Sequence, residues 1–174
     1  ENRHVRSARI ARMQLTARQE FSAPCDHVYA MSVDPAFLEQ VCRDLDAPSH
    51  TVAVSGPPDA AVTRVSAEIE TPGPMRPVAG PSVTVGQEMA WGPASADGSR
   101  TARLILKVAG MPVEVDAHAR LAPTASGCAV EYSGTLAVKV PILGPALEKQ
   151  SAPFILDTLA IQERSGNAWL ASRR

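Results

Sequence analysis

Aromatic residues are scarce in this sequence: they make up 4% of its 174 residues, as three Phe, two Trp and two Tyr. The interior must therefore be filled mainly by Val, Ala, Leu and Ile, whose side chains are small. Small side chains leave space inside a curved sheet, so this composition leaves room for an internal cavity.

Cysteine is rare as well. The three residues present, Cys25, Cys42 and Cys128, are an odd number and form no CxxC pair. They are too sparse for the disulfide framework of a small secreted domain. We therefore expect a reducing, cytoplasmic setting and no reactive cysteine.

The sequence has no excess of positive charge and no long apolar run. Its formal net charge of -1 gives no global attraction to nucleic acid or to an anionic membrane. No apolar stretch approaches the roughly 20 residues of a membrane-spanning helix, and the first residues lack the apolar part of a secretion signal. We expect no nucleic-acid partner, no stable membrane insertion, and a monomer or weak homodimer.

Motifs for metal and nucleotide binding are missing. The four histidines, His4, His27, His50 and His118, show no HExxH or other ligand spacing. No GxGxxG or Walker-type loop is present to bind a phosphate at a helix end. The sequence therefore predicts no metal and no cofactor.

What the sequence does contain is typical of one globular domain, with 45% hydrophobic and 20% charged residues. We place this domain at residues 13–174. Residues 1–12 carry Arg3, Arg6, Arg9 and Arg12 at a three-residue spacing with little apolar content. We interpret them as an arm-like extension, either a disordered leader before a start at Met13, which we favour, or a short basic helix that contacts acidic partners.

Alternation of polar and apolar residues predicts a first strand at Met13–Phe21. Ser22 and Pro24 then mark the start of a short helix that reaches about Ser32, and Pro35 starts a second helix that reaches about Leu45. Six further strands follow, at His50–Ser55, Ala61–Thr71, Ser82–Trp91, Arg100–Ala109, Pro112–Leu121 and Cys128–Val140.

Two segments break this run of strands. Pro72–Pro81 holds four prolines and two glycines, so it leaves the sheet and is a candidate mouth or lid loop. The segment from about Ile142 to Ala171 has apolar residues at helical spacing and predicts a long amphipathic helix across the sheet. Pro153 lies inside that segment, where it is expected to kink or loosen the helix.

This order of elements resembles the helix-grip fold of the START-like (SRPBCC) superfamily, which includes lipid-transfer, polyketide-cyclase and birch-pollen-allergen-like proteins. Local matches to an uncharacterised actinobacterial branch, a domain of unknown function, are Ala17–Phe21, Ala23–Pro24, Val28–Tyr29, Asp34–Phe37 and Gly166–Leu170. An excess of 14 Arg over 3 Lys also suits a high-GC actinobacterial genome.

The resemblance covers about Met13 to Leu170. It implies an α+β protein with a curved antiparallel sheet of about seven strands, two short helices after the first strand, and a long C-terminal helix across the concave face. It also implies a cavity between this face and the helix, and it transfers no catalytic motif.

The strand at Pro112–Leu121 has a polar face that contains Asp116 and His118. If this face pointed inward, the two residues would form an acid/base pair for a cyclase or hydrolase. If it points outward, they are solvated cross-strand partners. We favour the outward interpretation, because the inward one exposes five apolar side chains and buries four polar ones.

The same alternation gives an overwhelmingly apolar cavity wall. Four polar exceptions, Gln19, Thr63, Gln87 and Tyr132, would either orient a polar group of a ligand or satisfy neighbouring groups. The residues that we predict to bind a ligand are Gln19, Thr63, Gln87, Met89, Trp91, Leu104, Leu106, Tyr132, Leu136, Phe154, Ile155 and Leu159.

Three hypotheses for function follow. The first is a non-enzymatic carrier or sensor that holds a lipid, a polyketide or a similar apolar molecule. The second is a small cyclase or aromatase that uses Tyr132 or His118 for proton transfer. The third is an interaction module with a filled core and no ligand.

Overall fold

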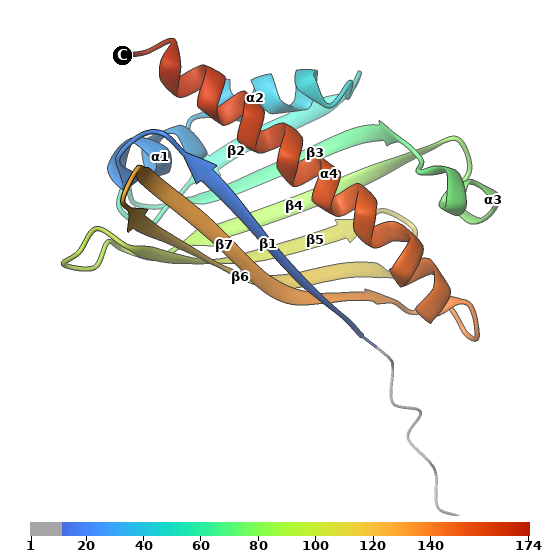
Figure 1. The fold of residues 1–174 in the computed structure, drawn as a ribbon. Coiled ribbons are helices and arrows are strands. Elements are labelled where there is room, and N and C mark those ends of the chain that lie inside the picture. Colours follow the sequence, from blue (N-terminus) through green and yellow to red (C-terminus); the bar gives the residue numbers. More distant parts are fainter. Residues whose placement is uncertain (1–11) are drawn as a thin grey trace, which may run out of the picture.

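The structure, a computed structural model, describes residues 12–174. It contains a seven-stranded antiparallel sheet in the order β1-β7-β6-β5-β4-β3-β2, which curves beneath a long helix (Figure 1). The arm expected at residues 1–12 lies outside the described residues except for Arg12. The strands are β1 Met13–Phe21, β2 His50–Ser55, β3 Val62–Glu70, β4 Ser82–Trp91, β5 Arg100–Val108, β6 Val113–Thr124 and β7 Gly127–Val138.

The helices confirm the α+β helix-grip prediction. They are α1 Cys25–Ser32, α2 Pro35–Asp44, the 3-10 turn η1 Gly73–Met75, α3 Arg76–Ala79 and α4 Gly144–Ala171. Helix α2 begins where predicted because Pro35 fits the first helical position and the Asp34 carboxylate accepts the Ala36 N–H at 2.9 Å. The loop predicted at Pro72–Pro81 contains two short helical segments, η1 and α3, each with a proline in its first turn.

The first strand pairs with the last one. Strand β1 lies antiparallel to β7, with Phe21 opposite Cys128 and Met13 opposite Leu136. Helix α4 packs mainly against β1, β7, α1, α2 and η1. It therefore lies closest to one side of the curved sheet.

The antiparallel topology gives the domain two distinct ends (Figure 1). The closed end carries α1 and the turns at residues 56–61, 92–99 and 125–126. The open end carries η1, α3, the β5–β6 turn and the β7–α4 loop. Within residues 12–174 no helix combines the length and the hydrophobicity that crossing a bilayer requires.

Candidate functional site

The concave face of the sheet is built from rows of paired side chains. In one row, Val65 pairs with Gln87, Gln87 with Leu106, Leu106 with Val115, and Val115 with Leu136. Because side chains alternate between the two faces of a strand, the whole row points toward α4. This face is apolar apart from a few residues.

Burial differs along this face. Near the closed end the concave side chains are buried, whereas on β3, β4 and β5 toward the open end they are only partly buried, because α4 packs on β1 and β7 instead. We call these half-buried residues the open concave surface. They are Val65, Ala67, Ile69, Val83, Val85, Gln87, Leu106 and Val108.

Two of the predicted polar anchors are engaged within the protein. The Tyr132 hydroxyl donates to Gln19 Oε1 at 3.0 Å, and Gln19 Nε2 donates to the Leu159 carbonyl of α4 at 2.9 Å. Gln19 is 3% exposed. Burial raises the pKa of the Tyr132 phenol, so it stays protonated at ordinary pH. This hydrogen-bonded chain connects β7 to β1 and β1 to the long helix.

Replacing Tyr132 with Phe tests whether this chain is structural. We expect Tyr132→Phe to lower the free energy of unfolding by about 1–2 kcal/mol, because Gln19 Oε1 loses its donor in a buried place. Urea unfolding measures this loss, and uptake of a fluorescent fatty acid should stay unchanged. Unchanged stability with lost uptake would instead make Tyr132 a ligand contact.

Four other predicted residues lie deeper along the same face, and all are buried: Thr63, Met89, Trp91 and Leu104. Trp91 packs edge-on against Tyr29, with ring centroids 5.6 Å apart and an interplanar angle of 84°. Its indole N–H is buried and has no hydrogen-bond partner among the described residues. The closed end therefore holds one unsatisfied donor in an apolar setting.

Helix α4 contributes the remaining predicted contacts unequally. Ile155 and Leu159 pack against the core, but Phe154 is 38% exposed. Leu136, from β7, is completely buried. Half-buried Gln87 thus remains as the polar side chain of the open concave surface, at the centre of the row between Val65 and Leu106.

The polar face of β6 points outward. Asp116 accepts two hydrogen bonds from Arg103, at 3.2 and 2.9 Å, and the same contact holds the Asp116 pKa below its usual value. His118 is exposed opposite Arg103 and Ser133 on this convex face. The acid/base pair considered for a cyclase is therefore a set of solvated cross-strand partners, as the alternation favoured.

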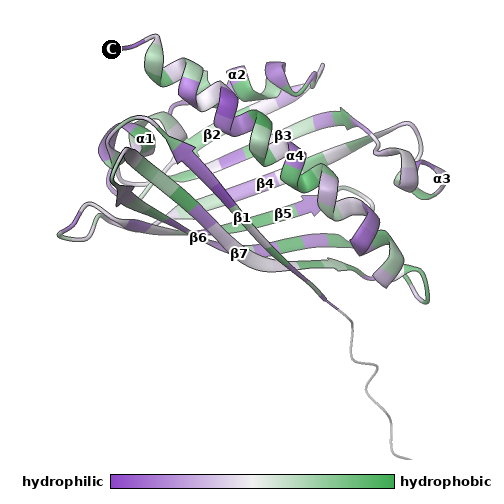
Figure 2. Ribbon diagram, in the orientation of Figure 1, coloured by the Kyte–Doolittle hydropathy of each residue, from purple (hydrophilic) through white to green (hydrophobic). Residues whose placement is uncertain are grey.

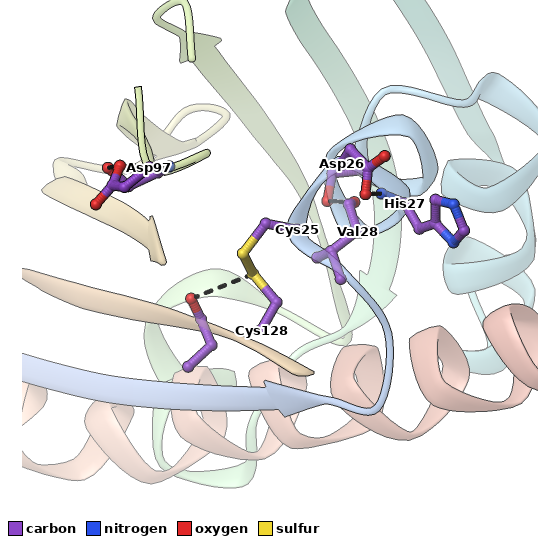
Figure 3. Close-up of a disulfide and its surroundings, with 9 residues drawn as sticks. Cys25, Asp26, His27, Val28, Asp97 and Cys128 are labelled. Carbon is purple, nitrogen blue, oxygen red and sulfur yellow. Dashed lines mark hydrogen bonds between the residues drawn. A yellow bond between two sulfur atoms is a disulfide. The ribbon is translucent and has the colours of Figure 1, made fainter. Parts of the chain in front are cut away.

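A disulfide joins Cys25 at the start of α1 to Cys128 on β7 (Figure 3). Sequence reasoning missed this bond because the two residues are 103 positions apart. The β1–β7 pairing brings them together: it sets Cys128 opposite Phe21, four residues before Cys25. The sequence analysis expected a reducing compartment because the cysteines are few and unpaired, and this disulfide removes the basis for that expectation.

The third cysteine, Cys42, is free and buried in α2. Burial raises its pKa, so its thiol stays protonated and unreactive. Within residues 12–174 no three His, Cys, Asp or Glu side chains lie together as possible metal ligands.

Two hollows open to solvent lie away from the concave face. One, of about 580 Å³, lies beside the disulfide at the closed end, and the other, of about 850 Å³, lies on the convex face around Arg18 and His118. Of the twelve predicted ligand-binding residues, Tyr132 alone borders either hollow. These hollows do not coincide with the predicted site.

Solved structures of low sequence identity share this fold. A STAR-related lipid transfer protein from Xanthomonas axonopodis has a TM-score of 0.59 and 15% identity, with 91% of this chain and 85% of that chain covered. The Zhui aromatase/cyclase from Streptomyces sp. R1128 has a TM-score of 0.58 and 11% identity, with 94% of each chain covered. A START superfamily protein from Mycobacterium smegmatis has a TM-score of 0.56 and 14% identity, covering 94% of this chain and 100% of that one.

These likenesses, together with the observed topology, show a START-like helix-grip fold. No curated protein matches the sequence. A family model described as "Protein of unknown function (DUF2505)" matches residues 16–170, which is most of the chain, and the chain therefore belongs to this family.

Proposed function

We propose that the protein holds an apolar small molecule between the concave face of its sheet and α4, as a carrier or sensor. The open concave surface carries this proposal. Seven of its eight side chains are apolar, yet all eight are only partly buried, including Leu106 at the edge of the core. Apolar area that neighbouring protein leaves uncovered is available to a ligand, and its burial favours binding by about 25 cal/mol per Å².

Gln87 gives this surface one group that can both donate and accept a hydrogen bond. Gln87 as a residue is partly buried, whereas the Gln19 amide is hydrogen-bonded to Tyr132 and Leu159. A ligand that is mostly apolar and carries a single carbonyl or hydroxyl group fits this arrangement. Lipids and polyketides have this character, and the structural neighbours include proteins named for lipid transfer and aromatase/cyclase activity.

The cyclase alternative gains no support from the candidate proton-transfer residues. His118 lies on the convex face, and Tyr132 donates its only proton to Gln19 inside the core. A ligand-free module is the other alternative, and it requires the open concave surface to stay empty. Absence of a nucleic-acid partner, a monomeric or weakly dimeric state, and a cytoplasmic location stay predictions; the disulfide, which is rare in reducing compartments, argues against the last.

A charge placed on the open concave surface tests the proposal. We expect Leu106→Arg to abolish retention of apolar molecules, because ligand binding would then require removing a guanidinium group from water. Leu106 is partly buried at the edge of the core, so circular dichroism must first show that the variant folds like wild type. The protein is purified under native conditions, extracted with organic solvent, and the extract is analysed by mass spectrometry.

Ile105→Arg is the matched control, because Ile105 is the adjacent residue on the same strand and points to the convex face. Its neighbours across the strands are Glu88 and Asp116, which would accommodate a new cation. An apolar molecule present with wild type and Ile105→Arg but missing with Leu106→Arg supports the proposal. If all three proteins are empty and none takes up cis-parinaric acid, the ligand-free module is correct.

A further inference from the structure

Exposed apolar side chains gather at the open end and along the first half of α4. The large hydrophobic residues that are exposed within residues 12–174 are Val78, Ile142, Leu143, Phe154 and Leu156. Ile142 is 96% exposed and Leu143 is 53% exposed. These two form what we call the apolar tip, in the β7–α4 loop, which has hydrophobic colouring at the lower right of Figure 2. Single exposed apolar residues are ordinary, but a cluster at one end indicates an interaction site.

The backbone holds the apolar tip in an unfavourable conformation. Ile142 has a φ of 67°, which is uncommon for a non-glycine residue and least favourable for a β-branched one. Such a conformation persists only where the surrounding structure fixes it, and it is concentrated at functional positions. The fold therefore holds the Ile142 side chain in solvent.

The corner around the tip is well fixed. The Gly144 N–H donates to the Val140 carbonyl at 2.8 Å, and the Val138 N–H donates to the buried Glu148 carboxylate at 2.9 Å. A Cβ on Gly144 would lie 2.3 Å from the Val138 carbonyl oxygen, so only glycine fits there. These contacts hold the β7–α4 connection in one shape.

Lysine flanks the tip on both sides. The chain has three lysines, and two of them are exposed here: Lys139 is the first residue of the β7–α4 loop and Lys149 is the sixth residue of α4. The ion pairs described within residues 12–174 involve neither of them. An apolar tip beside lysines on long flexible stems matches an anionic lipid surface, where ammonium groups contact phosphates while apolar groups enter the acyl boundary.

We propose that the open end docks reversibly on anionic phospholipid bilayers through Ile142, Leu143, Lys139 and Lys149. This inference rests on the proposed function, because docking at this end would place the open concave surface next to the source of an apolar ligand. Two residues at a loop tip give a peripheral contact rather than a span. The contact depends on both lipid charge and tip hydrophobicity.

Vesicle co-sedimentation tests the docking. We expect wild type to sediment with phosphatidylcholine vesicles that contain phosphatidylglycerol, to sediment much less with pure phosphatidylcholine, and to be released by salt. Ile142→Glu should weaken binding by about tenfold or more, since it replaces an inserting group with a repelled one. Ile142→Gly should also weaken binding, and it removes the unfavourable φ, so poor folding would not account for its loss.

One lysine variant tests the contribution of charge at the tip, and two control variants change charge elsewhere. Lys149→Gln should weaken binding about fivefold, in line with roughly 1 kcal/mol per lysine at an anionic surface. Arg164→Gln removes an exposed cation near the other end of the same helix and should have little effect. Ala96→Glu adds a negative charge at the closed end and should keep wild-type binding.

Failure of this proposal is distinguishable from failure of the proposed function. Ile142→Glu should still take up cis-parinaric acid from solution, and Leu106→Arg should still bind anionic vesicles. Equal vesicle binding by wild type and Ile142→Glu, or no binding by wild type, would overturn the docking proposal. A wild-type dimer in gel filtration that Ile142→Glu makes monomeric would also overturn it and would assign the tip to a second copy of the chain.

Discussion

Removing the Cys25–Cys128 disulfide should lower the free energy of unfolding by about 5 kcal/mol. The bond closes a loop of 103 residues, and in the chain-entropy model a loop of this length restricts the unfolded chain by roughly that amount. We expect the double variant Cys25→Ser, Cys128→Ser to show this loss in guanidinium unfolding. Both sulfur atoms are buried, so each Ser also replaces an apolar contact with a polar one.

Reduction provides the control for this experiment. Treating wild type with a thiol-free reductant should reproduce most of the loss, whereas the double variant should not respond to it. Alkylation of the unfolded protein should modify one thiol before reduction, that of Cys42, and three after it. Three reactive thiols before reduction in protein made under oxidising conditions would show that the disulfide does not form.

The Cys25–Cys128 disulfide could not be predicted from local sequence patterns. Alternation placed β1 and β7 correctly, and the ends of most strands agree with the prediction within a few residues. Their pairing is a long-range contact that periodicity alone does not specify, and the curved antiparallel sheet implied by the resemblance was not assigned a strand order. Without the Phe21–Cys128 pairing, nothing in the sequence distinguishes Cys128 from Cys42 as the partner of Cys25.

The candidate site, too, was predictable only where it depends on local alternation. Face assignment from alternation was sufficient to place Gln87 and Leu106 on the concave face and His118 on the convex face. It did not predict that Gln87 is half-buried while the Gln19 amide is hydrogen-bonded to Tyr132 and α4. That difference depends on where α4 crosses the sheet, and hence on packing between segments about 140 residues apart.

The sequence patterns did not predict the positive φ of Ile142 either. The predicted strand ended at Val140 and the predicted helix began at about Ile142, and both kinds of element have negative φ. The contacts of Gly144 and Glu148 with β7 impose the turn instead. Tertiary contacts therefore override local preference at the position on which the docking proposal depends.

Gly134 is a position in the middle of the sheet where a single methyl group should be strongly damaging. It lies on β7 between Leu15 of β1 and Ala117 of β6. A Cβ there would come within 2.3 Å of the Asp116 carbonyl oxygen and 2.4 Å of the Ala117 Cα. Because these are backbone atoms on a central strand, neither moves without separating β6 from β7.

We expect Gly134→Ala to lower the free energy of unfolding by about 3 kcal/mol or more, since overpacking against backbone is not relieved by a change of rotamer. Gly86→Ala is the matched control. It is also a strand glycine, but the nearest atom to its Cβ position is the Lys107 carbonyl oxygen at 3.9 Å, an ordinary contact. This control should be neutral or slightly stabilising, because glycine weakens a strand interior. Chemical unfolding of both variants gives the comparison, and equal stabilities would mean that β6 and β7 do not approach as closely at Gly134 as described.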